Sequence, residues 1–171
     1  MQDLLQELKA HGHVVLDGSR LVKLIDAEHI EFGFENGKSK ENIAVSHTED
    51  LELAMSVIHH ELAREFIEPC TDNFQVSTRL LWESSPAHHK RWHNDSTEKN
   101  NDMFFLLYFT DHRESDDGAL RFRNQTGEHR YVPFPGLLIA MENSDPRWSH
   151  MVETSTTRRI VASLGFKIDR A

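Results

Sequence analysis

Apolar residues recur at helical spacing over the first part of the chain. Three leucines within residues 4–8 predict a short helix that ends near Gly12, and the apolar stripe of residues 50–68 predicts a longer helix that Pro69 terminates. Between them, residues 13–18 have the pattern of a strand closed by a turn. The stretch before the longer helix is rich in Gly, Asn, Ser and charge, which is typical of a surface connection.

The pattern changes at about residue 74, where short aromatic and β-branched runs alternate with Gly, Pro, Asn and Asp clusters. Such runs predict the strands of an all-β sandwich or barrel. The predicted strands fall at residues 74–82, 103–110, 118–123, 129–134, 136–143 and 158–168. We therefore expect one domain over residues 1–171, in which residues 1–73 form a helical support and residues 74–171 form an antiparallel β-barrel core.

Composition and charge exclude some classes of function. With 171 residues, 38% of them hydrophobic, the chain is large enough for one globular domain. The formal net charge of −9 argues against a nucleic-acid partner, because such binding depends on clustered Lys and Arg. The single Cys70 cannot form an internal disulfide, the N-terminus does not resemble a signal peptide, and no apolar run approaches the ~20 residues of a membrane helix. We expect a cytoplasmic protein without a membrane partner.

One histidine pair begins a motif that the chain does not complete. His60 and Glu61 start the H-E-x-x-H pattern of zinc proteases, but the fifth position is Arg64. The second histidine ligand is therefore missing. We interpret His59 and His60 as surface residues of the longer helix.

A second group of residues fits a metal site better. His93 and Asp95 are two apart, so on an extended strand both project to the same side and can bind one metal ion. A third ligand could come from His150, the other histidine flanked by strand-like sequence downstream. Two histidines and one carboxylate form the facial triad of non-haem Fe(II) oxygenases. Taken alone, an H-x-D pair in a chain with 12 histidines also fits a solvated loop.

A basic residue downstream favours the metal site. Arg159 lies nine residues after His150, at the start of an apolar strand. A guanidinium inside a barrel needs a partner, because an unpaired buried charge is costly, and its forked donors suit a carboxylate. A free dicarboxylate cofactor would satisfy it. The neighbouring Arg158 competes for this role.

These residues, in this order, resemble the 2-oxoglutarate- and Fe(II)-dependent oxygenases. The resemblance covers roughly the second half of the chain, from "VSTRLLWESSPAHHKRWHND" through "DDGALRF" and "VPFPGLLIAMEN" to "RRIVASLGF". The helix-then-strand at the N-terminus is also similar to the start of many members. The resemblance implies a mainly β, α+β fold: a double-stranded β-helix, or jelly-roll and cupin-like barrel, braced by the N-terminal helices.

The resemblance also implies cofactors and residue roles. Fe(II) would be bound by His93, Asp95 and His150, and 2-oxoglutarate would chelate the iron through its 2-oxo acid end. The family's basic residue usually stands about nine or ten positions after the distal histidine, so Arg159 rather than Arg158 would pair with the far carboxylate. Hydroxylation with release of succinate and CO2 is the implied reaction, because the family's halogenases carry Gly or Ala at the carboxylate position.

Other positions bear on the cofactor site without deciding it. Tyr108 and Arg79 lie on or near predicted strands and are further candidate cofactor contacts. Val161 departs from the pattern, since some branches of the family carry Ser two residues after the arginine.

Two other classes of function compete. A cupin-type metal-binding protein, an isomerase or a sensor, could use the same ligands, but it has no use for a basic residue at Arg159. A nucleobase demethylase would carry further arginines beyond the first, and here only Lys167 and Arg170 follow. A short chain with little inserted sequence is compatible with a small molecule, a free amino acid or an exposed residue of a peptide or protein, such as proline, as substrate.

Overall fold

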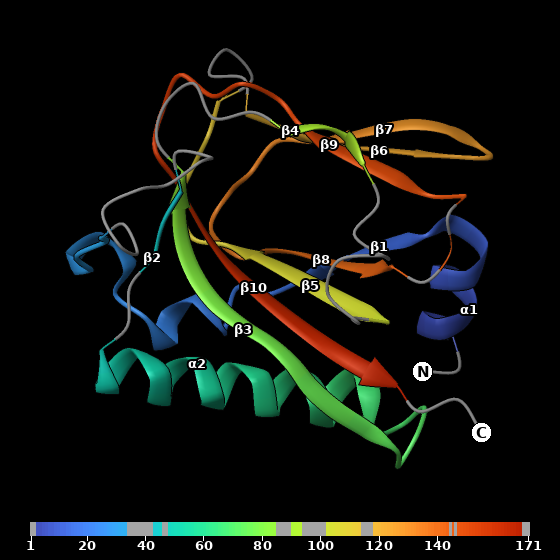
Figure 1. Cartoon of the computed structure of the whole chain (residues 1–171), viewed down its shortest axis with the longest axis horizontal. Helices are drawn as coiled ribbons and strands as arrows, with labels where there is room; N and C mark the ends of the chain where they lie inside the picture. The colour runs from blue at the N-terminus through green and yellow to red at the C-terminus, as the bar shows by residue number, and fades with distance from the viewer. Residues whose placement is uncertain are drawn as a thin grey trace.

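Two antiparallel sheets face each other in the protein (Figure 1). The computed structural model describes residues 3–33, 43–45, 48–84, 90–93, 102–113, 118–143, 145 and 147–168. In this part of the chain the larger sheet has the strand order β1-β8-β5-β10-β3-β2, and the smaller sheet has the order β4-β9-β6-β7. The strands are β1 (His13–Asp17), β2 (Ile43–Val45), β3 (Phe74–Ser84), β4 (Lys90–His93), β5 (Met103–Tyr108), β6 (Leu120–Asn124), β7 (Gly127–Tyr131), β8 (Leu137–Glu142), β9 (Ser149–Val152) and β10 (Arg159–Ile168).

Side-chain alternation along β10 decides which residues reach the space between the sheets. Val161 belongs to the apolar cluster between the sheets, whereas Ile160 and Ala162 belong to the cluster on the outer face of the larger sheet. Successive side chains of a strand point to opposite faces, so Arg159 and Ser163 share the inner face with Val161. A charged residue therefore begins the inner face of a strand that is otherwise mostly apolar.

Helix α2 (Glu49–Leu62) covers the outer face of the larger sheet (Figure 1). Thr48 begins it as an N-cap, its side-chain oxygen accepting a hydrogen bond from the backbone N–H of Leu51. The predicted helix over residues 50–68 continues past α2 as a π-helical turn, Ala63–Ile67. No helix in the described part of the chain is long and apolar enough to cross a membrane.

The N-terminal region supplies strands as well as helices. Helix α1 (Asp3–His11) ends at Gly12, whose φ of 79° lies in the left-handed region that glycine adopts without strain. The strands β1 and β2 pair with β8 and β3, so residues 1–73 complete the larger sheet besides bracing it. Two short 3-10 turns, Val22–Leu24 and Ala27–His29, follow β1.

The interpretation of His59 as a surface residue is wrong. Its ring is buried and packs edge-on against Phe166 of β10, with the ring centroids 4.4 Å apart, while His60 is exposed. Met55 lies four residues before His59, so both occupy the side of α2 that faces the sheet. Burial lowers the pKa of His59 to about 4, and the positive charge of Arg79 acts in the same direction.

Acid is expected to destabilise the fold through His59. In the unfolded chain a histidine titrates near pH 6.5, so below that pH unfolding takes up a proton that the folded protein accepts only near pH 4. The free energy of unfolding should therefore fall as the pH drops from about 6.5 to about 4, by at most about 1.4 kcal/mol per pH unit for this group. Urea denaturation at pH 7 and pH 5 should show this loss. The loss should be smaller in His59→Leu and unchanged in the control His60→Leu; an undiminished loss in His59→Leu would contradict the assignment.

Candidate functional site

Two of the predicted metal ligands lie side by side between the sheets. His93 of β4 and His150 of β9 are direct cross-strand partners, and their ring centroids are 4.1 Å apart. The His93 Nδ1–H donates to the backbone oxygen of Arg91 at 2.7 Å, a bond that fixes the ring and makes Nε2 the nitrogen with a lone pair. His150 is only 7% exposed. Two histidines 57 positions apart in the sequence therefore meet at one point of the smaller sheet.

The third predicted ligand, Asp95, lies outside the described residues. Among the residues that the structure does describe, no group of three or more His, Cys, Asp or Glu side chains could hold a metal ion. Because Asp95 is not among the described residues, the structure shows two of the three predicted ligands, His93 and His150. His88 and His89, which precede β4, also lie outside the described residues.

A row of aromatic rings, contributed by both sheets, packs beside His150. Phe122 of β6 is its cross-strand partner, with the ring centroids 5.8 Å apart. His13 of β1 stacks on Phe122, at 4.2 Å and with an interplanar angle of 7°, and its Nε2 lies 2.8 Å from the hydroxyl of Tyr131. Burial lowers the pKa of His13 to about 4, so the ring is neutral at pH 7. The row places an uncharged, packed wall behind the candidate metal ligand.

Arg159 is buried in the same interior with part of its guanidinium unpaired. Its side chain is 1% exposed, and its Nη1 donates to the backbone oxygen of Gly118 at 2.7 Å. Its Nε and Nη2 are buried and make no hydrogen bond with any residue that the structure describes. Burial lowers the pKa of Arg159, but an arginine keeps its charge in proteins. A buried cation with two unpaired donors lowers the stability of the fold, and a carboxylate could accept hydrogen bonds from both donors at once.

Two hydroxyl groups lie beside this guanidinium. Tyr108 of β5 is the cross-strand partner of Val161, two residues from Arg159 on the same face. Burial raises the pKa of Tyr108 to about 12, and the nearby charge of Arg159 opposes this shift only in part, so the phenol stays a neutral donor. Ser84 of β3 pairs directly with Arg159, and its Oγ is also buried, with no hydrogen-bond partner among the described residues. Arg159 and its cross-strand partner Ser84 thus present unsatisfied polar atoms in the described interior, with Tyr108 on the neighbouring strand.

The structure does not bring the predicted cofactor contact Arg79 into this interior. Arg79 pairs with Leu164 of β10, whose side chain belongs to the outer cluster, and its guanidinium lies 3.6 Å from the carboxylate of Glu52 on α2. It therefore points to the helix-covered side of the larger sheet. The sequence prediction included Arg79 and not Ser84. Side-chain alternation along β3 places Ser84, but not Arg79, on the inner face with Trp82.

Arg158 points away from the site. Its Nε donates to the carboxylate of Glu83 at 2.7 Å, its guanidinium lies over the ring of Phe32, and its side chain is 44% exposed. The two adjacent arginines thus occupy opposite faces of the larger sheet at the start of β10, and only Arg159 reaches the interior.

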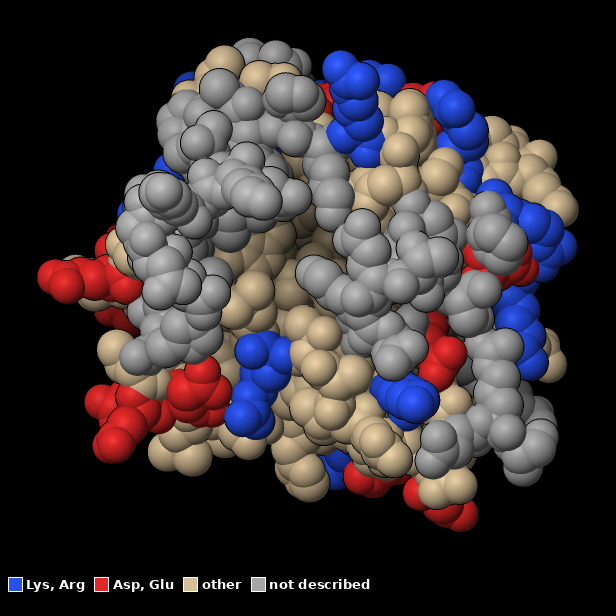
Figure 2. Space-filling model, viewed as in Figure 1, with Lys and Arg blue, Asp and Glu red and all other residues tan. Residues whose placement is uncertain are grey.

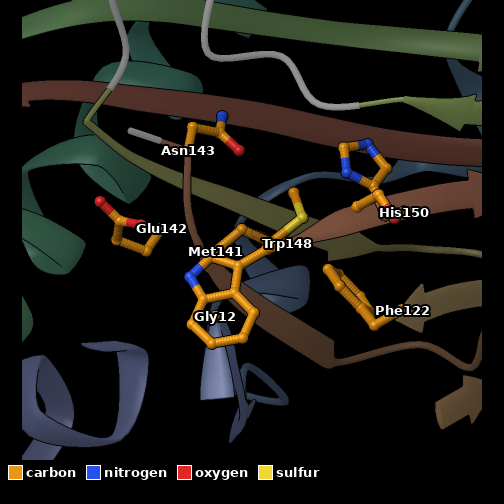
Figure 3. A pocket seen from close by; sticks show the side chains of 8 residues that line it. Gly12, Phe122, Met141, Glu142, Asn143, Trp148 and His150 are labelled. Carbon is orange, nitrogen blue, oxygen red and sulfur yellow. The ribbon is translucent and has the colours of Figure 1, made fainter. Parts of the chain in front are cut away.

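A pocket opens beside His150. It is lined by Gly12, Phe122, Met141, Glu142, Asn143, Trp148, Ser149 and His150 (Figure 3). The molecular surface is hollowed at the centre of the face seen in Figure 1, over the space between the sheets (Figure 2). Sequence reasoning did not identify Asn143, because nothing in the strand pattern around it signals a polar residue that the fold buries.

The donor set fits Fe(II) and a dicarboxylate. Imidazole nitrogens are suitable iron ligands, and two histidines that face each other at this distance can occupy neighbouring positions on one ion. Arg159, Ser84 and Tyr108 supply buried donors on the facing sheet, where a carboxylate would replace lost water. The chemistry of both parts therefore matches the implied metal and cofactor.

Comparison with known proteins gives structural neighbours only. No family model matches the chain, and no curated protein matches it in sequence. A prolyl 4-hydroxylase from Pseudomonas putida superposes with a TM-score of 0.65 at 17% identity, covering 98% of both chains. An oxidoreductase of the 2OG-Fe(II) oxygenase family from Burkholderia pseudomallei superposes with a TM-score of 0.73 at 12% identity, covering 97% of this chain and 89% of the other.

A third neighbour was solved with ligands. HygX from Streptomyces hygroscopicus, with nickel, 2-oxoglutarate and hygromycin B bound, superposes with a TM-score of 0.68 at 11% identity, covering 98% of this chain and 87% of that one. The structural neighbours across the full chain are thus 2-oxoglutarate- and Fe(II)-dependent oxygenases, prolyl 4-hydroxylases among them. The predicted mainly β fold is confirmed: the chain has the double-stranded β-helix fold of these oxygenases.

Proposed function

We propose that this protein is a 2-oxoglutarate- and Fe(II)-dependent dioxygenase that hydroxylates a small molecule, an amino acid or a peptide side chain. The observation that carries the proposal is Arg159: a guanidinium that is 1% exposed, with two unpaired donors, in the interior that also holds His93 and His150. The shared fold with oxygenases supports this function.

Each part of the site has a separate task under this proposal. His93, His150 and Asp95 would hold Fe(II), and Arg159 would pair with the distal carboxylate of 2-oxoglutarate, with Tyr108 as a neutral donor beside it. Bound together, the metal and 2-oxoglutarate would supply the oxidising chemistry with O2, which ends in succinate, CO2 and a hydroxylated product. The chain itself orients these groups and keeps water from them.

The packed interior supports this division of work. Both ring nitrogens of His13 lie within hydrogen-bond distance of other groups, the His11 backbone oxygen and the Tyr131 hydroxyl, so His13 does not compete with His150 for a metal ion. The apolar cluster between the sheets, which includes Val161 and Leu106, limits the water available to a bound carboxylate. Low water content strengthens the pairing with Arg159.

A metal-binding protein of the cupin type is the alternative, and Arg159 separates the two. Such a protein would need the two histidines, but it would have no use for Arg159. A buried cation with unpaired donors lowers stability unless a ligand pairs with it. In a dioxygenase, 2-oxoglutarate would bind the metal held by the histidines at one end and Arg159 at the other, so both features have a role.

Measurement of succinate release tests the proposal. The purified protein with Fe(II), ascorbate and 2-oxoglutarate should release succinate, and a matching substrate should increase the rate. The screen should include free amino acids, small metabolites and prolyl peptides, since one neighbour from Trichoplax adhaerens was solved with a peptide fragment and HygX with hygromycin B. The Arg159→Ala protein is the control. Release at the same rate from that variant, or no release and no 2-oxoglutarate binding by the unaltered protein, would refute the proposed function.

A further inference from the structure

The hydrogen bond between Arg159 and Gly118 joins the two sheets across the interior. Arg159 begins β10 of the larger sheet, and Gly118 lies two residues before β6 of the smaller sheet. The backbone N–H of Gly118 donates to the oxygen of Thr154 at 2.9 Å, which extends the pairing of β6 with β9 to this residue. The oxygen that accepts from Arg159 therefore belongs to a backbone that the smaller sheet holds in place.

This bond determines which edge of the guanidinium remains available. Nη1 donates to Gly118 at 2.7 Å, whereas Nε and Nη2 have no hydrogen-bond partner among the described residues. In the planar guanidinium the N–H of Nε lies parallel to one N–H of Nη2, and such a pair can donate to both oxygens of one carboxylate. Gly118 thus leaves unoccupied an edge of Arg159 that can bind a carboxylate through two parallel bonds.

The position of this carbonyl requires glycine at residue 118. The φ of Gly118 is 74°, in the left-handed region. A Cβ added there would lie 2.9 Å from both Cβ and Oγ of Ser155, and 3.3 Å from Nδ1 of His112. Any larger residue would have to displace these neighbours or move its own backbone, and with it the oxygen that Arg159 binds.

Ser155 closes the turn that leads from β9 into β10. Its side chain is buried, and its Oγ donates to the oxygen of Thr157 at 2.7 Å and accepts from the N–H of Thr157 at 3.1 Å. The Thr157 hydroxyl lies 3.3 Å from Nδ1 of His112, so the side chains that pack on Gly118 also contact one another. Arg159 follows this turn by two residues. One buried polar cluster therefore orders both the donor and the acceptor of the bond between the sheets.

We propose that Gly118 and Ser155 are positioning residues, which hold the guanidinium of Arg159 so that its Nε and Nη2 face the distal carboxylate of a dicarboxylic 2-oxo acid. The inference rests on the proposed function, since it takes 2-oxoglutarate as the ligand of Arg159. It adds the residues that prepare Arg159 for this ligand. A donor pair that is oriented before binding does not have to be ordered by the ligand, so the preference for a dicarboxylate should depend on Gly118 as well as on Arg159.

Comparison of two 2-oxo acids tests this assignment. 2-Oxopentanoate has a methyl group where 2-oxoglutarate has its distal carboxylate, so it keeps the 2-oxo acid end and cannot pair with Arg159. Each acid is titrated into the Mn(II) protein, and binding is followed by electron paramagnetic resonance of the bound ion. In Gly118→Ala the affinity for 2-oxoglutarate should fall at least about tenfold, because the donor pair loses its orientation, while the affinities for 2-oxopentanoate and Mn(II) should stay unchanged.

Gly127→Ala is the matched control for the backbone. Gly127 also has a positive φ, 137°, but a Cβ added there would meet no described atom within 4 Å. The two variants thus share the strain of the backbone conformation, and only Gly118→Ala displaces a carbonyl that Arg159 binds. Gly127→Ala should bind both 2-oxo acids as the unaltered protein does.

Ser155→Ala is a second variant that avoids the steric clash at Gly118. It keeps the backbone of the turn and removes the two hydrogen bonds to Thr157. The affinity for 2-oxoglutarate should fall at least about threefold, and that for 2-oxopentanoate should stay unchanged. This variant decides the question if Gly118→Ala does not fold.

The other outcomes separate the two proposals. If the unaltered Mn(II) protein does not bind 2-oxoglutarate, or binds the two acids equally well, Arg159 does not hold a distal carboxylate and the proposed function fails. If the unaltered protein prefers 2-oxoglutarate and either folded variant keeps the full preference, the positioning assignment is wrong while the proposed function stands. Equal loss of affinity for both acids, or loss of Mn(II) binding, would show that Gly118 and Ser155 serve the fold alone.

Discussion

Replacing Arg159 by alanine should weaken 2-oxoglutarate binding by at least about 100-fold and leave metal binding nearly intact. The Nε and Nη2 groups of Arg159 are buried and unpaired, and each charge-assisted hydrogen bond they would make to a carboxylate contributes about 1.5–3 kcal/mol. Calorimetric titration of 2-oxoglutarate into the Mn(II) protein measures the loss directly. Arg159→Lys should recover only part of the affinity, because an ammonium cannot reproduce the forked geometry.

Arg158→Ala is the matched control for this experiment. Arg158 is adjacent in sequence but lies on the other face, where its partner is Glu83, and an exposed ion pair contributes about 0–1 kcal/mol. The control should bind 2-oxoglutarate normally. If Arg158→Ala fails to bind and Arg159→Ala binds, the two arginines have exchanged roles; if both bind normally, the cofactor assignment is wrong.

Stability of the apo protein gives a second, independent result for the same residue. A buried cation whose donors are only partly used costs free energy, so Arg159→Met, which keeps much of the side-chain volume, should unfold at the same or a higher temperature. With Mn(II) present, 2-oxoglutarate at 100 times its dissociation constant should increase the free energy of unfolding of the unaltered protein by roughly 2.7 kcal/mol, and its unfolding midpoint should rise accordingly. The midpoint of Arg159→Met should not rise.

Alternation along single strands was accessible from the sequence, and it decides much of the site. It separates Arg159 from Arg158, and applied to β3 it would also have excluded Arg79: three positions separate Arg79 from Trp82, so they lie on opposite faces. The helical period of 3.6 residues likewise places His59 with Met55 on the buried side of α2. The faces that Arg79 and His59 occupy are therefore encoded in the local sequence pattern.

The pairing of strands that are distant in the sequence cannot be predicted from such local patterns. His93 and His150 meet because β4 and β9 adopt one particular register in the smaller sheet, and a shift by a single residue would turn one ring outward. Burial of Asn143 depends on where the end of β8 meets Asp102, which no local pattern specifies. Register and the packing of chain ends are properties of the assembled sheets, so these parts of the site required the fold.

Replacing either His93 or His150 by alanine should remove metal binding and, with it, any succinate release. The two rings face each other at 4.1 Å, and each would supply one of the few protein ligands of the ion. Loss of a group that merely orients a ligand already costs 10–100-fold in metal affinity, so loss of the ligand itself should cost at least about 100-fold. Titration of Mn(II), followed by electron paramagnetic resonance of the free ion, measures this affinity in each variant.

Two further variants, a control and a change at the predicted carboxylate ligand, complete this experiment. His60→Ala changes an exposed histidine of α2 and should bind Mn(II) as the unaltered protein does. Asp95→Ala should also lose turnover, although it is less decisive, since a two-histidine site can keep some metal. Because His93 and His150 face each other as cross-strand partners and would bind the same ion, both alanine variants should lose Mn(II) affinity. Normal Mn(II) affinity in either one would show that the paired histidines are a packing feature of the smaller sheet and would leave Arg159 without a metal-bound cofactor to hold.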